Sequence, residues 1–223
     1  MKLYSYFRSS ASYRVRIALQ LKGLDYTYVP VHLVRGEHLQ PAHAQRQGDA
    51  LVPQLQTSDG HVLGQSMAII EYLEEAYPDT PRLLPAGAVA RARVRGLAQM
   101  VACDIHPLNN LRVLKYLVHG VHVSEESKTA WYHHWVRGGL EAFERQLALL
   151  AEERAREGMA PSRYCWGDAP TLADCCLVPQ LFNAQRFQVR LDNLPLTMGV
   201  YAACTQLPAF QQAQPSACPA SEA

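Results

Sequence analysis

The chain has 223 residues, of which 48% are hydrophobic and 18% charged, which is enough for one large domain or two small ones. Lysine and arginine number 21 and aspartate and glutamate 20, so the formal net charge is +1. A chain this close to neutral lacks the basic surface that binds nucleic acid and the polybasic segment that binds anionic membranes.

The longest apolar runs are too short to span a bilayer, and residues 1–8 contain no apolar signal core. We therefore expect a cytoplasmic protein with neither a nucleic acid nor a membrane as partner. The six cysteines are too few and too irregularly spaced for a disulfide scaffold in a chain of this length, and we expect reduced thiols.

The first 80 residues alternate strand-like and helix-like stretches. Between the first two strands, apolar residues recur at helical spacing from Ser12 to Lys22, and Gly23 ends the pattern. Asp59-Gly60 between two short apolar stretches is a hairpin signal, and Ser66 caps the next helix. The sequence predicts strands at 2–6, 26–31, 52–56 and 61–63, and helices at 12–22, near 36 and at 66–77.

After residue 90 the pattern is helical only. A long helix, bent at Pro107, is predicted from Val89 to Val118, and a second one at about 126–156. Thr171 and Asp174 have the spacing of a capping box before an apolar helix. The fold class is therefore an α/β N-terminal domain followed by an all-α C-terminal domain.

The turn that precedes the first helix is the first candidate site. A helix N-terminus presents unpaired amides and a partial positive charge, and a serine hydroxyl there can donate a hydrogen bond to a thiolate. Ser9 and Ser10 occupy this turn. The alternative is ordinary capping of the helix by Ser10 or Ser12.

Three further patterns are candidates, each with a structural alternative. Val52-Pro53 opens a strand and fits either a cis proline or a trans proline on an edge strand. Gln65-Ser66 at a helix start suits a carboxylate ligand or a simple cap. The stretch 104–110 interrupts a helix with a proline and two asparagines, which fits a functional bend or an ordinary kink. The sequence has no nucleotide-binding glycine motif and no H-E-x-x-H, and we expect no metal site.

Several segments resemble the zeta class of the glutathione transferase family. The stretch SSASYRVRIAL at 9–19 is similar to the class signature SSCSxRVRIAL, and the segments 65–75 and 174–180 fit the same class. This class includes maleylacetoacetate isomerases and bacterial maleylpyruvate isomerases. The segments 104–110 and 37–39 resemble the maleylpyruvate branch.

The resemblance covers about residues 1–213 and implies the glutathione transferase architecture. It implies a thioredoxin-like, glutathione-binding domain over 1–80, a linker over 81–90, an all-helical substrate-binding domain over 91–213, and a loose tail over 214–223. It also implies a homodimer.

By matching motif, Gln65 and Ser66 are expected to hold the γ-glutamyl carboxylate of glutathione. Val52, before an implied cis-Pro53, is expected to pair with its cysteinyl backbone. The implied glutathione-binding residues are Ser9, Ser10, Ala11, His38, Val52, Gln65, Ser66, His106 and Asn110. The implied catalytic residues are Ser9, Ser10 and Arg8, and the residues implied to bind the substrate carboxylates are Arg8, Arg112 and Arg186.

The implied activity is glutathione-dependent cis–trans isomerisation of maleylpyruvate or maleylacetoacetate, small unsaturated keto-dicarboxylates of aromatic catabolism, by reversible thiolate addition. Two departures from the class stand in this chain: Ala11 replaces the usual cysteine, and Gln47-Gly48-Asp49-Ala50 replaces an Asn-Pro segment. Ala11 argues against a reductive dehalogenase, which needs a protein cysteine. The alternatives are a broad glutathione transferase acting on haloacids or other electrophiles, and a non-catalytic binding protein with this fold.

Overall fold

The computed structural model describes residues 1–219, which form two compact units. Residues Met1–Leu84 and the segment that begins at Thr205 make up the first unit, and Pro85–Cys204 make up the second. Each unit is described by itself below. Within the described residues, none of the helices has the length and apolar content needed to cross a membrane.

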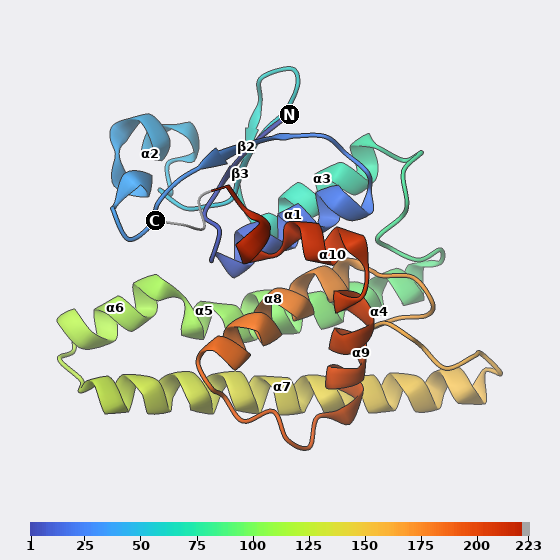
Figure 1. The fold of residues 1–223 in the computed structure, drawn as a ribbon. Helices are drawn as coiled ribbons and strands as arrows, with labels where there is room; N and C mark the ends of the chain where they lie inside the picture. The colour runs from blue at the N-terminus through green and yellow to red at the C-terminus, as the bar shows by residue number, and fades with distance from the viewer. Residues whose placement is uncertain (220–223) are drawn as a thin grey trace. The chain divides into compact units, whose positions relative to one another are not determined.

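The first unit is built on a four-stranded sheet in the order β2-β1-β3-β4 (Figure 1). Strand β1 (Lys2–Ser5) pairs in parallel with β2 (Thr27–Pro30) and antiparallel with β3 (Gln54–Gln56), which pairs with β4 (Val62–Leu63). Leu3 and Leu55 lie in register on adjacent strands, and both are fully buried. The predicted α/β N-terminal domain is confirmed.

The helices of the first unit follow the predicted order. They are α1 (Ser10–Leu21), the 3₁₀ turn η1 (Glu37–Leu39), α2 (Pro41–Gln47) and α3 (Ser66–Ala76). Helix α1 packs against α3, and its apolar residues Val15, Ile17, Ala18 and Leu19 are fully buried.

A buried ion pair joins α1 to α3. Lys22 Nζ lies 3.1 Å from Glu74 Oε2, with side chains only 1% and 7% exposed. The carboxylate of Glu74 also accepts hydrogen bonds from the backbone amides of Leu83 and Leu84. These bonds hold residues 83–84 against the first unit, whereas the sequence placed them in the linker.

The second unit contains only helices among its regular elements. They are α4 (Ala88–Gln99), the π-helical turn η2 (Met100–Ile105), α5 (His106–Asn109), α6 (Leu111–His119), α7 (Glu125–Arg156), α8 (Leu172–Arg186) and α9 (Pro195–Thr205). The predicted all-helical second half is confirmed.

The prediction of one long helix from Val89 to Val118, bent at Pro107, is wrong, because α4, η2, α5 and α6 divide this stretch. Helical hydrogen bonding changes at η2, where Pro107 on the next turn has no amide to donate. Asn110 then adopts an extended conformation, and its side chain accepts a hydrogen bond from the amide of Arg112 at 3.1 Å. Asn110 thus ends one helix and caps the next.

Asp174 forms the predicted capping box at the start of α8. Its carboxylate accepts hydrogen bonds from the amide and hydroxyl of Thr171, both at 2.7 Å, and from the amide of Cys165 at 2.9 Å. Asp174 is fully buried, and this burial raises the pKa of its carboxyl group.

The C-terminal segment belongs to the first unit and differs from the predicted loose tail. Helix α10 (Pro208–Ala213) packs against α1, and the 3₁₀ turn η3 (Pro215–Ala217) follows it (Figure 1). Cys218 is 5% exposed and packs with Tyr6, Phe7, Val31 and Val52. The segment 214–219 is therefore packed, and the last four residues of the predicted tail, 220–223, lie outside the described residues.

Candidate functional site

The N-terminus of α1 carries the predicted serines. Ser9 is the N-cap residue, and its Oγ accepts a hydrogen bond from the amide of Ser12 at 3.2 Å. Capping was expected at Ser10 or Ser12, but the structure assigns it to Ser9. Because Ser9 Oγ accepts here, its own hydroxyl hydrogen can donate to a ligand. Ser10 and Ala11 follow at the first helical positions, where the helix dipole carries its partial positive charge.

No cysteine occupies this turn, because Ala11 stands at the position of the class cysteine. All six cysteines of the chain are free, and all but Cys103 are buried. Burial raises the pKa of the Cys165, Cys204 and Cys218 thiols, which keeps them protonated. The thiolate that the α1 N-terminus can stabilise must therefore come from a bound ligand.

The Val52-Pro53 peptide bond is cis, as the resemblance implied. Val52 is 9% exposed, and Pro53 separates it from the start of β3. The carbonyl of the preceding Leu51 lies 2.9 Å from His43 Nε2, and the Leu51 amide donates to Asp49 Oδ1 at 3.1 Å. Both backbone groups of Leu51, which follows the departing segment 47–50, are therefore held by hydrogen bonds.

His43 is a supporting residue that sequence reasoning missed. It is buried on α2, and its Nδ1 lies 3.4 Å from Arg46 Nη1. A guanidinium can only donate, so Nδ1 is the acceptor and Nε2 carries the proton that Leu51 accepts. A lone histidine on a short polar helix gives no sequence signal for this role.

Gln65 and Ser66 lie at the N-terminus of α3. Gln65 has a φ of 63°, a left-handed conformation that is uncommon for a residue with a side chain, and such outliers concentrate at binding sites. It occupies the N-cap position, yet its side chain makes no capping hydrogen bond, so the capping alternative fails for Gln65. Ser66 is the first helical residue and is 5% exposed.

Arg14 supports Ser66 and was also missed. It is 2% exposed on α1, and its Nη1 donates a hydrogen bond to Ser66 Oγ at 3.2 Å. The sequence places an arginine in the signature but gives no indication that it faces α3. The arrangement places a guanidinium charge directly behind the hydroxyl that was predicted to hold a carboxylate.

The other predicted residues of the first unit are more exposed. Arg8 is exposed, with its guanidinium 4.9 Å from the ring centroid of Phe7. His38 is half-buried in η1. The neighbouring Glu37 carboxylate accepts a hydrogen bond from the His32 amide at 2.6 Å, which fixes the turn that carries His38.

In the second unit, the structure brings two of the predicted residues together. The Asn110 side-chain amide lies 3.2 Å from His106 Nε2, across the junction of α5 and α6. Arg112 is exposed on the first turn of α6. Arg186, the last residue of α8, is also exposed, with its guanidinium 4.7 Å from the ring centroid of Phe187.

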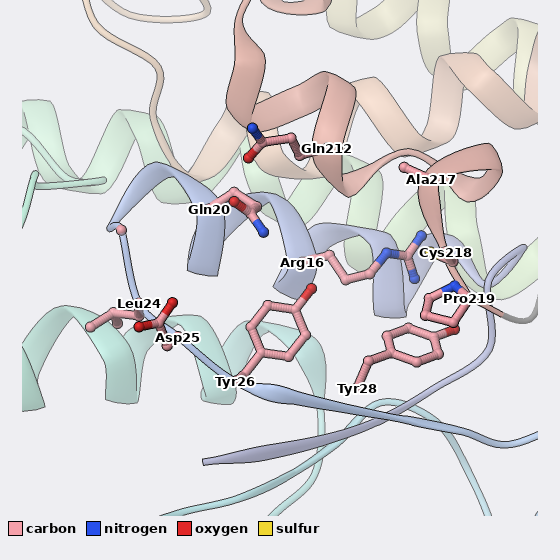
Figure 2. Close-up of a pocket in the computed structure, with 11 residues that line it drawn as sticks. Arg16, Gln20, Leu24, Asp25, Tyr26, Tyr28, Gln212, Ala217, Cys218 and Pro219 are labelled. Carbon is pink, nitrogen blue, oxygen red and sulfur yellow. The ribbon is translucent and has the colours of Figure 1, made fainter.

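Two pockets lie apart from the predicted residues. One, of about 370 Å³ in the first unit, lies between the C-terminal half of α1, Tyr26, Tyr28 and Cys218 (Figure 2). The other, of about 400 Å³ in the second unit, is lined by His133, His134 and residues around them. None of the predicted site residues lines either pocket.

The chain resembles known proteins along its whole length. Residues 3–81 match the family "Glutathione S-transferase, N-terminal domain". The chain is 51% identical to a maleylpyruvate isomerase from a Ralstonia species, covering 99% of this chain and 100% of the relative. It is 49% identical to a maleylacetoacetate isomerase from Pseudomonas aeruginosa, covering 97% of this chain and 96% of the relative.

Solved structures give the same result. A holo structure of maleylpyruvate isomerase, described as a bacterial glutathione S-transferase of the zeta class, matches with a TM-score of 0.91 at 49% identity, over 99% of this chain and 100% of that one. A maleylacetoacetate isomerase from Methylobacterium extorquens, solved with bound malonate and glutathione, matches with a TM-score of 0.91 at 34% identity, over 100% of both chains.

Proposed function

The chain belongs to the zeta class of the glutathione S-transferase family, and we propose that it is a glutathione-dependent cis–trans isomerase of maleylpyruvate or maleylacetoacetate. The observation that carries the proposal is the α1 N-terminus. There Ser9 and Ser10 stand at a helix N-terminus, which carries a partial positive charge, and Ala11 supplies no thiol. This turn can stabilise a thiolate, but it needs a bound thiol to provide one.

The donor set of the first unit fits glutathione. The Ser66 hydroxyl, with Arg14 behind it, and the Gln65 side chain suit an α-carboxylate at the N-terminus of α3. The backbone of Val52 suits an extended peptide, and His38 on η1 is proposed as a further contact. In the second unit, we propose His106 and Asn110 as further contacts, because their side chains already lie together.

Glutathione supplies the thiolate, whose reversible addition to the conjugated alkene turns the double bond into a rotatable single bond. The protein raises the fraction of thiolate through a hydroxyl of Ser9 or Ser10 and the partial positive charge of α1. A free thiol has a pKa of about 8.5 and is only a few per cent ionised at neutral pH. A downward shift of about two units makes it mostly anionic, which is within the range that helix N-termini achieve.

Arginines hold the substrate in this proposal. A keto-dicarboxylate carries two carboxylates, and the planar guanidinium group pairs with a carboxylate through two hydrogen bonds. Arg8, Arg112 and Arg186 are all exposed and can donate to a ligand. Arg8 directly precedes the capping residue Ser9. We therefore propose that its guanidinium group stabilises the negative charge that develops on the substrate carbonyl oxygen.

We also propose that the enzyme is a cytoplasmic homodimer. Helix α6 supports the dimer, because Leu111 and Tyr116 are 42% and 67% exposed and Val121, just beyond the helix, is 52% exposed. Apolar residues gathered on one short segment favour contact with another protein surface. Light scattering on the purified protein tests the dimer, and a monomeric mass would contradict it.

The function is tested by mixing the purified protein with glutathione and maleylpyruvate and following the loss of the cis-enone absorbance. Maleylacetoacetate runs alongside, and reactions without glutathione or without protein are the controls. We expect fast conversion only when glutathione and protein are both present, and the ratio of the two rates identifies the preferred substrate. Conversion of neither keto acid, with glutathione consumed on haloacids instead, would contradict the isomerase and favour a broad transferase.

A further inference from the structure

We propose that Arg16 is a positioning residue that couples the C-terminal segment 206–219 to the turn carrying Arg8, Ser9 and Ser10. The proposal rests on the proposed function, in which this turn stabilises the thiolate. It concerns a buried arginine of α1 to which the mechanism above gives no role.

Arg16 is 1% exposed and donates toward the turn from its guanidinium group. Its Nη2 donates to the Phe7 carbonyl at 3.0 Å, and its Nη1 donates to the Tyr6 carbonyl at 3.4 Å. The Tyr6 carbonyl also accepts from the Ser9 amide at 3.0 Å. Arg16 therefore binds the carbonyls of two successive peptide groups, Tyr6-Phe7 and Phe7-Arg8, immediately before the residues proposed to act in catalysis.

The same guanidinium group binds the C-terminal segment. Arg16 Nε donates to the Ala213 carbonyl at 2.8 Å, at the end of α10. Figure 2 shows Arg16 extending from α1 toward Cys218, which packs in one cluster with Tyr6 and Phe7. One planar cation thus joins a carbonyl of α10 to two carbonyls of the turn.

A second contact joins α10 to α1. It is made by Tyr13, which lies about one helical turn before Arg16 on α1. The hydroxyl of Tyr13 donates to the Phe210 carbonyl at 3.4 Å, and the Tyr13 ring lies 5.1 Å from the Arg16 guanidinium carbon. Phe210 itself is 1% exposed. Because Phe210 is buried three residues before Ala213 on the same helix, its truncation is expected to disturb the position of the Ala213 carbonyl.

This geometry makes the position of the turn depend on two distant parts of the sequence. Loss of Arg16 leaves the Phe7 carbonyl without this donor and the Tyr6 carbonyl with the Ser9 amide as its donor. Loss of the Phe210 packing disturbs the Ala213 acceptor that fixes Arg16. The serine hydroxyls and helix amides are then held less precisely toward a bound thiolate, and they stabilise it less. The expected consequence is a higher pKa of the bound thiol, and not a loss of the fold.

The test uses the full-length protein with the variants Arg16→Lys, Arg16→Met, Phe210→Ala and Arg16→Lys/Phe210→Ala. Gln212→Ala, an exposed position on the same α10, is the matched control. The first readout is hydrogen–deuterium exchange of the peptide over residues 6–12 in the protein without glutathione. We expect faster exchange in the single variants at Arg16 and Phe210 and unchanged exchange in Gln212→Ala, whether or not the protein is an isomerase.

The second readout is the pH dependence of kcat/KM with glutathione and maleylpyruvate. We expect the acidic limb to move toward higher pH by about one unit in each single variant, with a smaller change in KM for the keto acid. Because both changes act on one connection, the double variant should shift the limb no further than the larger single shift. Arg16→Met is expected to shift the acidic limb more than Arg16→Lys does, because lysine retains a hydrogen-bond donor.

Unchanged exchange over residues 6–12 in folded Arg16→Lys and Phe210→Ala would overturn the coupling. Additive shifts in the double variant would overturn it as well. A wild-type protein that shows no glutathione-dependent isomerisation, yet loses protection of residues 6–12 in both variants, would contradict the proposed function and leave the coupling established.

Discussion

Arg14 and Ser66 lie on different helices of the first unit and are joined by a hydrogen bond of 3.2 Å from Nη1 to Oγ. Both residues are buried, at 2% and 5% exposure. The direction of this bond is fixed, because a guanidinium group has no acceptor. The Ser66 hydroxyl therefore keeps its own hydrogen for a ligand acceptor, and a carboxylate is the acceptor that the neighbouring positive charge favours.

Ser66→Ala is expected to weaken glutathione binding by about tenfold to a hundredfold, because a hydrogen bond to a charged group contributes about 1.5–3 kcal/mol. The turnover number at saturating glutathione should change little, since the sulfur lies at another part of the site. Titration calorimetry with glutathione measures the affinity, and Ser58→Ala on an exposed loop is the control.

Cysteinylglycine lacks the γ-glutamyl group. It therefore distinguishes the loss of a contact to the γ-glutamyl carboxylate from a general disturbance of the active site by the substitution. With this thiol, wild type and Ser66→Ala should perform alike. A penalty that persists with cysteinylglycine would mean that Ser66 does not bind the γ-glutamyl carboxylate.

The double variant Ser9→Ala/Ser10→Ala is expected to move the acidic limb of the kcat/KM profile toward higher pH. The reactive form is the thiolate, so activity falls as pH drops through the thiol pKa, and a raised pKa moves that fall upward. Ser9→Ala alone should also lower the free energy of unfolding by about 1 kcal/mol, because the N-cap of α1 is lost. A pH profile identical to that of wild type would exclude both serines from thiol activation.

Asp174→Ala is expected to lower the free energy of unfolding by about 3 kcal/mol, because three buried donors lose their acceptor. Burial raises the pKa of Asp174 above 3.8, so the folded protein binds this proton more tightly than the unfolded chain. The contribution of this titration is therefore fully present below pH 3.8 and is lost as pH rises through the folded-state pKa. Urea unfolding of wild type and variant at several pH values measures the difference, which should be larger at acid than at neutral pH, and Asp168→Ala is the exposed control.

Lys22→Met is expected to destabilise the first unit by about 3–5 kcal/mol, because it leaves the Glu74 carboxylate buried without its cation. Lys22→Met/Glu74→Leu should cost less than the sum of the single changes, since no uncompensated charge remains. Lys128→Met, which breaks an exposed pair with Glu125, should cost less than about 1 kcal/mol. Additive costs at Lys22 and Glu74 in thermal unfolding would show that the two charges do not interact.

Local patterns were sufficient to predict much of the fold and of the site. The alternation of strand and helix up to Tyr77, the capping box at Asp174 and the long helix at about 126–156 follow from short-range spacing, and all are present. The cis bond at Val52-Pro53 followed only from the resemblance, because nothing in the adjoining residues distinguishes it from a trans bond.

The residues that support the site could not be predicted in the same way. Arg14, Arg16 and His43 act through partners that are 52, 197 and 8 residues away in sequence. A buried arginine looks like any other arginine until its partner is known. The segment after 213 was misjudged for the same reason, because its small polar composition hides the long-range packing of Cys218 with Tyr6 and Phe7.

The central claim is that glutathione acts catalytically on a cis keto-dicarboxylate. The most direct measurement is conversion of maleylpyruvate in large excess over glutathione, with the product followed by proton NMR and total glutathione measured at the end. The account predicts complete conversion to the trans isomer with all glutathione recovered as the free thiol. A reaction that stops after one equivalent of glutathione, with the thiol bound in a stable conjugate, would contradict it.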